Sequence, residues 1–405
     1  MKLQSFIKEI VIISIVLISQ GSVGQVPYER ILNASDEPQN WLTYNGGYMS
    51  QRYSLLDQIN RENVNQLELK WVLQNQVFGA WQSNPIIVDG VMYVTERPNS
   101  VMAVDAVTGR VYWKYRHQNA ENALVCCGAN NRGVAVLNDK VYMGTLDAHL
   151  VALDRVNGQR LWEAEVGDVN LAYSVTMAPL AVKDKILVGV GGGEFGIRGY
   201  VAAFNAETGE QAWKTYTIPG PGEANHDSWE GDDWEHGGAP VWITGSFDSD
   251  LNLTYWGVGN PGPDWNAGQR PGDNLYSDSA IALDADTGEL KWYFQFTPND
   301  AYDYDSVQVP VLADMEWRGE AKKVMMWANR NGYFYVLDRT NGQFLVGKPY
   351  VKVNWSSGLE ENGRPIPSPQ REGMPTYPGN QGGTNWYPPS YSPSTGLFYF
   401  SAWEN

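Results

Sequence analysis

The sequence predicts an all-β fold, a β-propeller built from repeated four-stranded sheets. The first observation is an internal repeat: a strand, a tight turn with glycine in the left-handed position, and a strand that closes with tryptophan. Its clear copies end at Trp113, Trp162, Trp213 and Trp292, and a degenerate copy covers 336–346. Trp113 and Trp162 are 49 residues apart, and Trp162 and Trp213 are 51 apart. Repeats of this length made of short strands are typical of propeller blades.

Hairpins and composition are the second and third observations. Residues 85–94 read as a hairpin around Asp89-Gly90, and 134–143 and 180–188 have the same design. The 42 glycines, 17 tryptophans and 23 tyrosines favour a chain rich in turns and sheets.

The repeat also predicts an insertion and a number of blades. Trp213 and Trp292 are 79 residues apart, so we place an insertion at the glycine-, proline- and tryptophan-rich segment 219–240. From the period, the chain holds about six blades. We interpret the repeated tryptophan as a flat side chain that packs between neighbouring blades.

The N-terminus has the plan of a secretory signal over residues 1–24. Lys2 and Lys8 precede an apolar run over 10–18, and small residues follow at 22–24. The run is too short to span a bilayer, so we expect no stable membrane insertion. We therefore expect a soluble protein exported to the periplasm, with one propeller domain over 25–405.

The formal net charge of -17 indicates which partners the surface favours. Such a surface repels nucleic acid and anionic membranes, and it attracts a basic partner by electrostatic steering. The alternative interpretation is that acidity only keeps an exported protein soluble.

The only two cysteines, Cys126 and Cys127, are neighbours in the sequence. A disulfide between adjacent residues forms a tight, strained ring, and such strain is typical of functional sites. The alternative is two free buried thiols. An exported protein favours the disulfide because its compartment is oxidising.

Several motifs together resemble the periplasmic quinoprotein alcohol dehydrogenases, the methanol/ethanol dehydrogenase family that uses pyrroloquinoline quinone (PQQ). They are the cysteine pair followed by 131–133, the glycine-rich stretch 191–199, and the segments 259–263 and 303–305. The resemblance covers 28–405. It implies an eight-bladed propeller that is incomplete at the C-terminus of this chain. It also implies oxidation of primary alcohols to aldehydes by hydride transfer to metal-bound PQQ, with a soluble cytochrome c as electron acceptor and a homodimer as an allowed state.

Four oxygen-donor residues follow glycine-rich segments and suit a hard cation, namely Glu194, Asn260, Asp303 and Asp305. Taken singly, each could be an ordinary turn or capping residue. The resemblance implies that Glu194 and Asn260 bind the metal and that Asp303 is the general base for the substrate hydroxyl. Asp305 resembles the lanthanide-using branch, because a further carboxylate suits a trivalent cation. We expect a light lanthanide, with calcium as the alternative.

The resemblance also implies how the flat quinone is held. Trp242 would form the floor of its site and the Cys126–Cys127 disulfide the ceiling. Arg132, Thr176 and Arg330 would bind its polar groups, and the backbone at Gly192-Gly193 would approach closely because no side chain intervenes. Gln82 and Asn385 complete the predicted cofactor contacts.

Departures from the methanol-type pattern favour the ethanol-type branch. Gln82 stands where methanol-type members carry Glu, Gly191 where Ser is frequent, and Pro240 where they carry Thr. No Cys-x-x-Cys-His haem motif is present in this sequence. The competing hypotheses are a non-catalytic propeller scaffold of the outer-membrane assembly type and a quinoprotein sugar dehydrogenase. The cysteine pair argues against both.

Overall fold

A computed structural model describes residues 24–369 and 373–404, so the predicted signal lies almost wholly outside the described residues. Helical structure is sparse there and consists of short pieces: α1 (Tyr28–Leu32), η1 (Ala34–Asp36), η2 (Val64–Gln66), η3 (Val169–Leu171), η4 (Gly193–Phe195), η5 (His226–Ser228), η6 (Asp233–Glu235) and η7 (Ala267–Gln269). Across the described ranges, no helix has the length and apolar character needed to cross a membrane.

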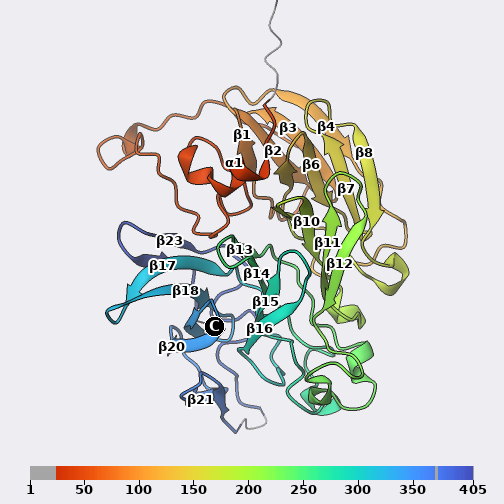
Figure 1. The fold of residues 1–405 in the computed structure, drawn as a ribbon, viewed down its shortest axis with the longest axis vertical. Helices are drawn as coiled ribbons and strands as arrows, with labels where there is room; N and C mark the ends of the chain where they lie inside the picture. The colour runs from red at the N-terminus through yellow and green to blue at the C-terminus, as the bar shows by residue number, and fades with distance from the viewer. Residues whose placement is uncertain (1–23, 370–372, 405) are drawn as a thin grey trace, which may run out of the picture.

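Within the described residues, the strands form five four-stranded antiparallel sheets that follow one another around the molecule (Figure 1). The first two are β1 (Ile86–Val88), β2 (Val91–Glu96), β3 (Ser100–Asp105), β4 (Val111–Arg116), and β5 (Ala135–Leu137), β6 (Lys140–Gly144), β7 (His149–Asp154), β8 (Arg160–Glu165). The third and fourth are β9 (Leu180–Val182), β10 (Lys185–Gly189), β11 (Tyr200–Asn205), β12 (Gln211–Tyr216), and β13 (Ser246–Asp248), β14 (Leu253–Gly257), β15 (Ser279–Asp284), β16 (Leu290–Gln295).

The fifth sheet is β17 (Val311–Trp317), β18 (Glu320–Ala328), β19 (Tyr333–Asp338) and β20 (Gln343–Pro349). Two two-stranded sheets follow, β21 (Ser356–Leu359) with β22 (Pro365–Pro367), and β23 (Ser390–Ser392) with β24 (Leu397–Tyr399). The predicted all-β propeller fold is confirmed.

Burial within each sheet follows from the order of its strands. The first strands β5 and β9 are short, apolar and buried throughout, whereas the last strands β4 and β8 contain only exposed and half-buried residues. The core therefore lies on the side of the first strands. The predicted hairpin around Asp89-Gly90 is present, with Val88 paired to Val91.

The repeated tryptophan joins neighbouring sheets, as the sequence predicts. Trp113 donates from Nε1 to the carbonyl of Arg155 at 3.1 Å, and its ring lies against Gly158 in the next outer turn. Gly158 has φ +74°, a conformation that only glycine adopts at little cost. Trp162, Trp213 and Trp292 make the same pair of contacts with Gly209, Gly288 and Gly342 and with the carbonyls of Ala206, Ala285 and Arg339. We call each such contact an outer corner.

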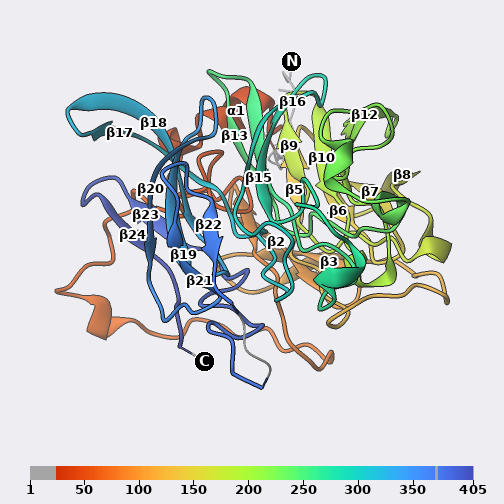
Figure 2. The ribbon, with the colours of Figure 1, turned by 90° about the horizontal axis from the view of Figure 1, so that it is seen from below.

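The structure adds one outer corner that the sequence analysis missed. Trp71 donates from Nε1 to the carbonyl of Ala106 at 3.2 Å, and its ring faces Gly109. Trp71 belongs to the largely exposed segment 53–81, which loops out beside the sheets and contains no assigned strand (Figures 1 and 2). No strand precedes Trp71 in the repeat pattern, so the period could not reveal it.

The insertion is wider than predicted. Segment 219–240 contains η5 and η6, and 258–278, between β14 and β15, also lies outside the strands. Arg198 fixes the first part, because its guanidinium lies over the rings of Tyr216 and Trp234 at 3.9 and 4.7 Å. These loops lead to the cavity described next.

Candidate active site

Loops from different sheets meet at a cavity of about 270 Å³. It is lined by all the predicted site residues except two: Gln82, Cys126, Cys127, Arg132, Thr176, Gly192, Glu194, Trp242, Asp303, Asp305, Arg330 and Asn385. The two exceptions, Gly193 and Asn260, are buried directly behind its wall. The fold thus gathers residues from positions 82 to 385 in one place.

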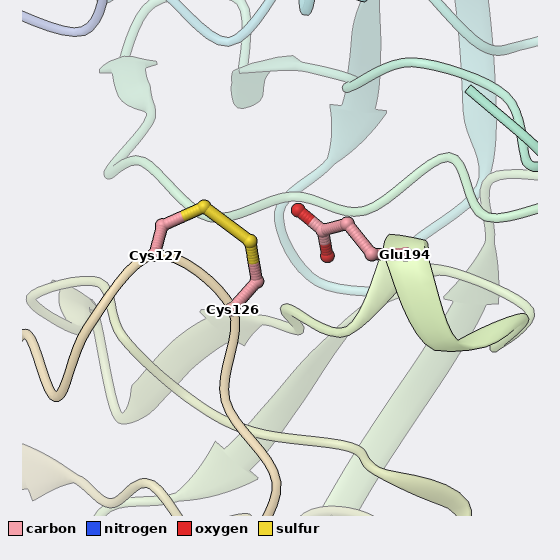
Figure 3. Close-up of side chains that lie close together, drawn as sticks. All are labelled: Cys126, Cys127 and Glu194. Carbon is pink, nitrogen blue, oxygen red and sulfur yellow. A yellow bond between two sulfur atoms is a disulfide. The ribbon is translucent and has the colours of Figure 1, made fainter. Parts of the chain in front are cut away.

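Cys126 and Cys127 form a disulfide at the edge of this cavity. Figure 3 shows the carboxylate of Glu194 directed at the two sulfurs, and one carboxylate oxygen lies within 4.8 Å of both. Because the sulfurs are bonded to each other, they offer no thiolate to a metal ion. Of these three residues, only Glu194 is therefore a plausible cation ligand.

Arg330 joins the two predicted carboxylates of segment 303–305. Its Nη2 lies 2.9 Å from Asp303 Oδ2, and its Nη1 lies 2.7 Å from Asp305 Oδ2. Asp305 also accepts from Trp242 Nε1 at 3.2 Å and from the backbone N–H of Asn260 at 3.1 Å. Asp305 thereby connects the predicted floor of the quinone site to the predicted metal ligands.

Asp303 is held by a buried turn. The side chain of Asp300 accepts from the backbone N–H groups of Tyr302 and Tyr304 at 2.9 and 2.8 Å. Asp303 itself has φ +62°, which is unusual for a residue other than glycine. Its side chain stays 21% exposed, so a small molecule in the cavity can reach it. Asp300 was not among the predicted residues, because an aspartate that caps a turn is common in any sequence.

Two carboxyl groups of the cavity, Glu194 and Asp303, have raised pKa values. Burial raises the pKa of Glu194 to about 7, and the charges of Asp305 and Asp264 add to the effect. Burial and the charge of Asp305 raise the pKa of Asp303 to about 8. Clustered acids of this kind are expected at a site that binds a positive charge.

Another part of the cavity lining is aromatic and cationic. The guanidinium of Arg132 lies 4.8 Å from the Trp242 ring centroid and 5.4 Å from that of Trp386, and its Nη1 donates to Thr176 Oγ1 at 2.9 Å. Within the described part of the chain, Arg132 Nε and Gln82 Oε1 are buried without a hydrogen-bond partner. Such orphaned atoms are costly unless a ligand satisfies them.

Glycine allows the backbone at 192–193 to pack closely beside the cavity. A Cβ on Gly192 would lie 2.3 Å from the carbonyl oxygen of Ala172, and one on Gly193 would lie 2.9 Å from the Pro240 ring. Any side chain at these two positions would displace the backbone that lines the site.

Some lining residues were not predicted, namely Asn130, Ser174, Gln381 and Tyr387. Ser174 had a usable signal: it stands two residues before Thr176 in an extended stretch, and alternate residues share a face there. Asn130 and the pair Gln381 and Tyr387 lie in irregular loops, where the sequence has no period to follow.

Known proteins share this architecture and sequence. Residues 41–362 match the PQQ family described as glucose/ethanol/alcohol dehydrogenase, β-propeller domain. The chain is 40% identical to the quinoprotein alcohol dehydrogenase PedH of Pseudomonas putida KT2440, over 96% of this chain and 70% of PedH.

Two solved structures superpose closely. The quinohemoprotein alcohol dehydrogenase ADHIIG from Pseudomonas putida HK5 gives a TM-score of 0.89 at 41% identity, covering 94% of this chain and 59% of that one. A structure described as a europium-containing methanol dehydrogenase gives 0.88 at 37% identity, covering 92% and 70%. The chain therefore spans 59–70% of the length of these three proteins.

Proposed function

Because this chain belongs to the PQQ-dependent glucose/ethanol/alcohol dehydrogenase family, we propose that it oxidises primary alcohols to aldehydes with PQQ and one metal ion. The observation that carries the proposal is the content of one 270 Å³ cavity: a disulfide, an aromatic floor, a cluster of carboxylates and an arginine. A propeller that serves only as a scaffold has no need for buried carboxylates, an arginine and a disulfide around one cavity.

The residues of the cavity fit a flat, polyanionic quinone. Trp242 offers a stacking face, and the disulfide offers a second apolar surface. Arg132 Nε and Gln82 Oε1, both without partners in the described structure, supply one donor and one acceptor for its polar groups. When bound, PQQ supplies the electrophilic carbonyl that accepts the hydride.

Glu194, Asn260, Asp303 and Asp305 would hold the metal. Three carboxylates and one amide oxygen are hard donors that suit a calcium-like or lanthanide cation. Burial, with repulsion between carboxylates, raises the pKa of Glu194 and Asp303. The positive charge of a cation would offset both effects and leave both groups ionised at neutral pH. We propose a light lanthanide, because the carboxylate of Asp305 adds negative charge.

Asp303 would act as the general base. Its carboxylate is partly open to the cavity and is oriented by Arg330 Nη2 at 2.9 Å. Once ionised, one of its oxygens can accept the proton of an alcohol hydroxyl within hydrogen-bond reach. Arg330 would then neutralise charge beside the reacting atoms and keep the carboxylate from rotating.

The acceptor of the electrons would be a basic cytochrome c in the periplasm. The formal net charge of -17 attracts a cationic partner. Cytochrome c reduction should therefore slow as ionic strength rises, because salt screens the attraction.

Dye-linked oxidation of primary alcohols by the protein, with and without PQQ and with calcium or a light lanthanide, tests the proposal. We expect turnover only when both PQQ and a metal are present, and more turnover with the lanthanide. Failure to bind PQQ at all would overturn the proposed function. Full turnover with calcium and no gain from the lanthanide would overturn only the choice of metal.

A further inference from the structure

The loop 117–134 between β4 and β5 carries Cys126, Cys127 and Arg132 to the cavity. The structure describes all residues of this loop, and none of them belongs to a helix or strand. An irregular loop keeps its side chains in place only where buried contacts hold it. The position of the disulfide therefore depends on contacts outside the cavity.

The part of the loop that follows the disulfide is tied to the first two sheets. Arg97 Nε donates to the carbonyl of Ala129 at 3.0 Å, and Thr95 Oγ1 donates to the carbonyl of Asn131 at 3.2 Å. Asn131 Nδ2 donates to the carbonyl of Gly144 at 2.9 Å. These bonds fix 129–131 and leave the part before the disulfide to other contacts.

Asp147, between β6 and β7, holds the part before the disulfide. Nε2 of His117 lies 3.0 and 3.1 Å from its two carboxylate oxygens, and the backbone N–H of Ala120 donates to Oδ2 at 2.9 Å. Thr145 Oγ1 donates to Oδ1 at 2.6 Å. The side chains of His117 and Asp147 are each 5% exposed. One buried carboxylate thus ties two points of the loop to the second sheet.

The carboxylate of Asp147 is charged at neutral pH. Burial alone would raise its pKa, but hydrogen bonds from His117 and Thr145, with His149 nearby, hold the pKa well below its usual range. Nδ1 of His149 lies 3.7 Å from Oδ1, so this imidazole adds electrostatic support without a short hydrogen bond. Bonds to a buried charged acceptor are stronger than bonds between neutral groups.

We call the loop 117–134 the lid loop. We propose that Asp147 is a positioning residue for the Cys126–Cys127 disulfide of this loop, on which it acts through His117 and Ala120. Asp147 does not line the cavity. Two other side-chain contacts precede the disulfide, and both are between neutral amides: Asn119 meets the buried Asn99, and Asn122 joins Asn170 at 2.8 Å on the exposed surface. Bonds between neutral groups hold a loop less firmly than bonds to a buried charge. Asp147 is therefore the buried anchor of this part of the lid loop.

The test compares Asp147→Asn with Asp154→Asn in the full chain without PQQ or metal. Asp154 is a matched control, because it lies in the same sheet and accepts from the backbone N–H groups of Val156 and Asn157 at 2.8 and 3.0 Å. An asparagine amide has one acceptor oxygen where the carboxylate has two. Asp147→Asn therefore removes at least one bond to the loop, whereas Asp154→Asn changes only an outer turn.

Chymotrypsin cleavage reports the movement of the lid loop. We expect Asp147→Asn to speed cleavage after Leu124, which is 54% exposed, relative to cleavage after Trp265, which is 56% exposed. The ratio should rise about tenfold, the effect of roughly one lost hydrogen bond. Reduction of the disulfide by dithiothreitol should accelerate in parallel, and Asp154→Asn should change neither rate.

Two results would overturn the proposal: an unchanged ratio, or equal acceleration at both cleavage sites, which would indicate general loss of stability. His117→Phe keeps the Asp147–Ala120 bond and serves as the second variant if Asp147→Asn does not fold. It should raise the same ratio, and no rise would also overturn the proposal.

Only one further measurement rests on the proposed function. PQQ binding, followed by quenching of tryptophan fluorescence, should weaken about tenfold in Asp147→Asn. If the unsubstituted chain binds no PQQ, the proposed function fails, while the cleavage ratio still decides the role of Asp147.

Discussion

The outer corners and the cavity belong to the same sheets but follow opposite designs. Each outer corner repeats one arrangement, in which a tryptophan donates to a carbonyl of the next sheet and lies against a left-handed glycine. The cavity is lined instead by residues of several loops, from Gln82 to Tyr387, that share no repeated motif. Repetition therefore joins neighbouring sheets, whereas irregular loops supply the residues of the candidate site.

Aspartates show the same contrast electrostatically. At an outer corner, hydrogen bonds from the Tyr112 hydroxyl and from the N–H groups of Thr108 and Val107 lower the pKa of Asp105. In the cavity, burial and neighbouring carboxylates raise the pKa of Asp303 to about 8. The corner satisfies its charge locally, while the cavity leaves charge to be neutralised by a ligand.

Asp303→Asn should separate the two regions most sharply. Removal of the proposed base should lower alcohol turnover by roughly 10²–10⁴-fold, while the thermal unfolding midpoint changes little. Asp105→Asn, at an outer corner, is the control and should leave turnover intact. Steady-state dye reduction and calorimetry on both variants measure the two effects, and full turnover in Asp303→Asn would refute its role as base.

Trp213→Ala should show the reverse pattern. The Trp213 side chain is buried between two sheets and donates to the carbonyl of Ala285 at 3.3 Å. Its truncation should lower the free energy of unfolding by about 3–5 kcal/mol, with turnover per folded molecule unchanged. Trp265→Ala, at an exposed position, should change stability by only about 0.5 kcal/mol. Urea unfolding measures both variants. Equal losses of unfolding free energy in Trp213→Ala and Trp265→Ala would show that the outer corner does not stabilise the fold more than an exposed tryptophan does.

Two glycine substitutions separate the cost of a side chain at positive φ from the cost of its clash with the tryptophan ring of an outer corner. Gly90→Ala and Gly158→Ala both place a side chain at positive φ, but a Cβ on Gly90 meets nothing within 4 Å, whereas one on Gly158 lies 2.5 Å from the Trp113 ring. Gly90→Ala should therefore cost only the conformational penalty, about 1–2 kcal/mol. Gly158→Ala should cost roughly 1–3 kcal/mol more, because the tryptophan must move. Similar losses in urea unfolding would show that the ring contact contributes little.

The sequence revealed these two regions to different extents. The corners at Trp113 and Trp162 were predictable because period and residue type agree, and Trp71 was missed because no repeat precedes it. Most of the cavity residues were named only through motifs that resemble a family. Asp300 is placed by turn geometry, and Ser174 by an isolated bridge to Gly191. Asp147 contacts residues that precede it by 30 and 27 positions, a separation that no local pattern records.

The pH dependence of metal binding tests the electrostatic half of the comparison. Because their raised pKa values are about 7 and about 8, Glu194 and Asp303 hold protons at pH values where ordinary carboxyls have lost them. A metal ion must displace these protons, so its affinity should rise as pH increases from about 6 to about 8 and level off above that. The slope should approach roughly tenfold per pH unit for each proton released.

The stability of the metal-free protein should move the other way. The unfolded chain loses these protons near the ordinary carboxyl pKa values of 4.5 and 3.8, while the folded chain keeps them until about pH 7 and about pH 8. The stabilisation from the neutral carboxyls is therefore complete below about pH 4 and is lost as pH rises toward 8, and bound metal should abolish this loss. Calorimetric metal titrations and thermal melts at several pH values measure both trends, with Glu194→Gln as the variant that should flatten them. A metal affinity independent of pH would mean that Glu194 and Asp303 are already ionised in the metal-free protein. The carboxylates of the cavity would then be stabilised by their surroundings, as Asp105 is at an outer corner.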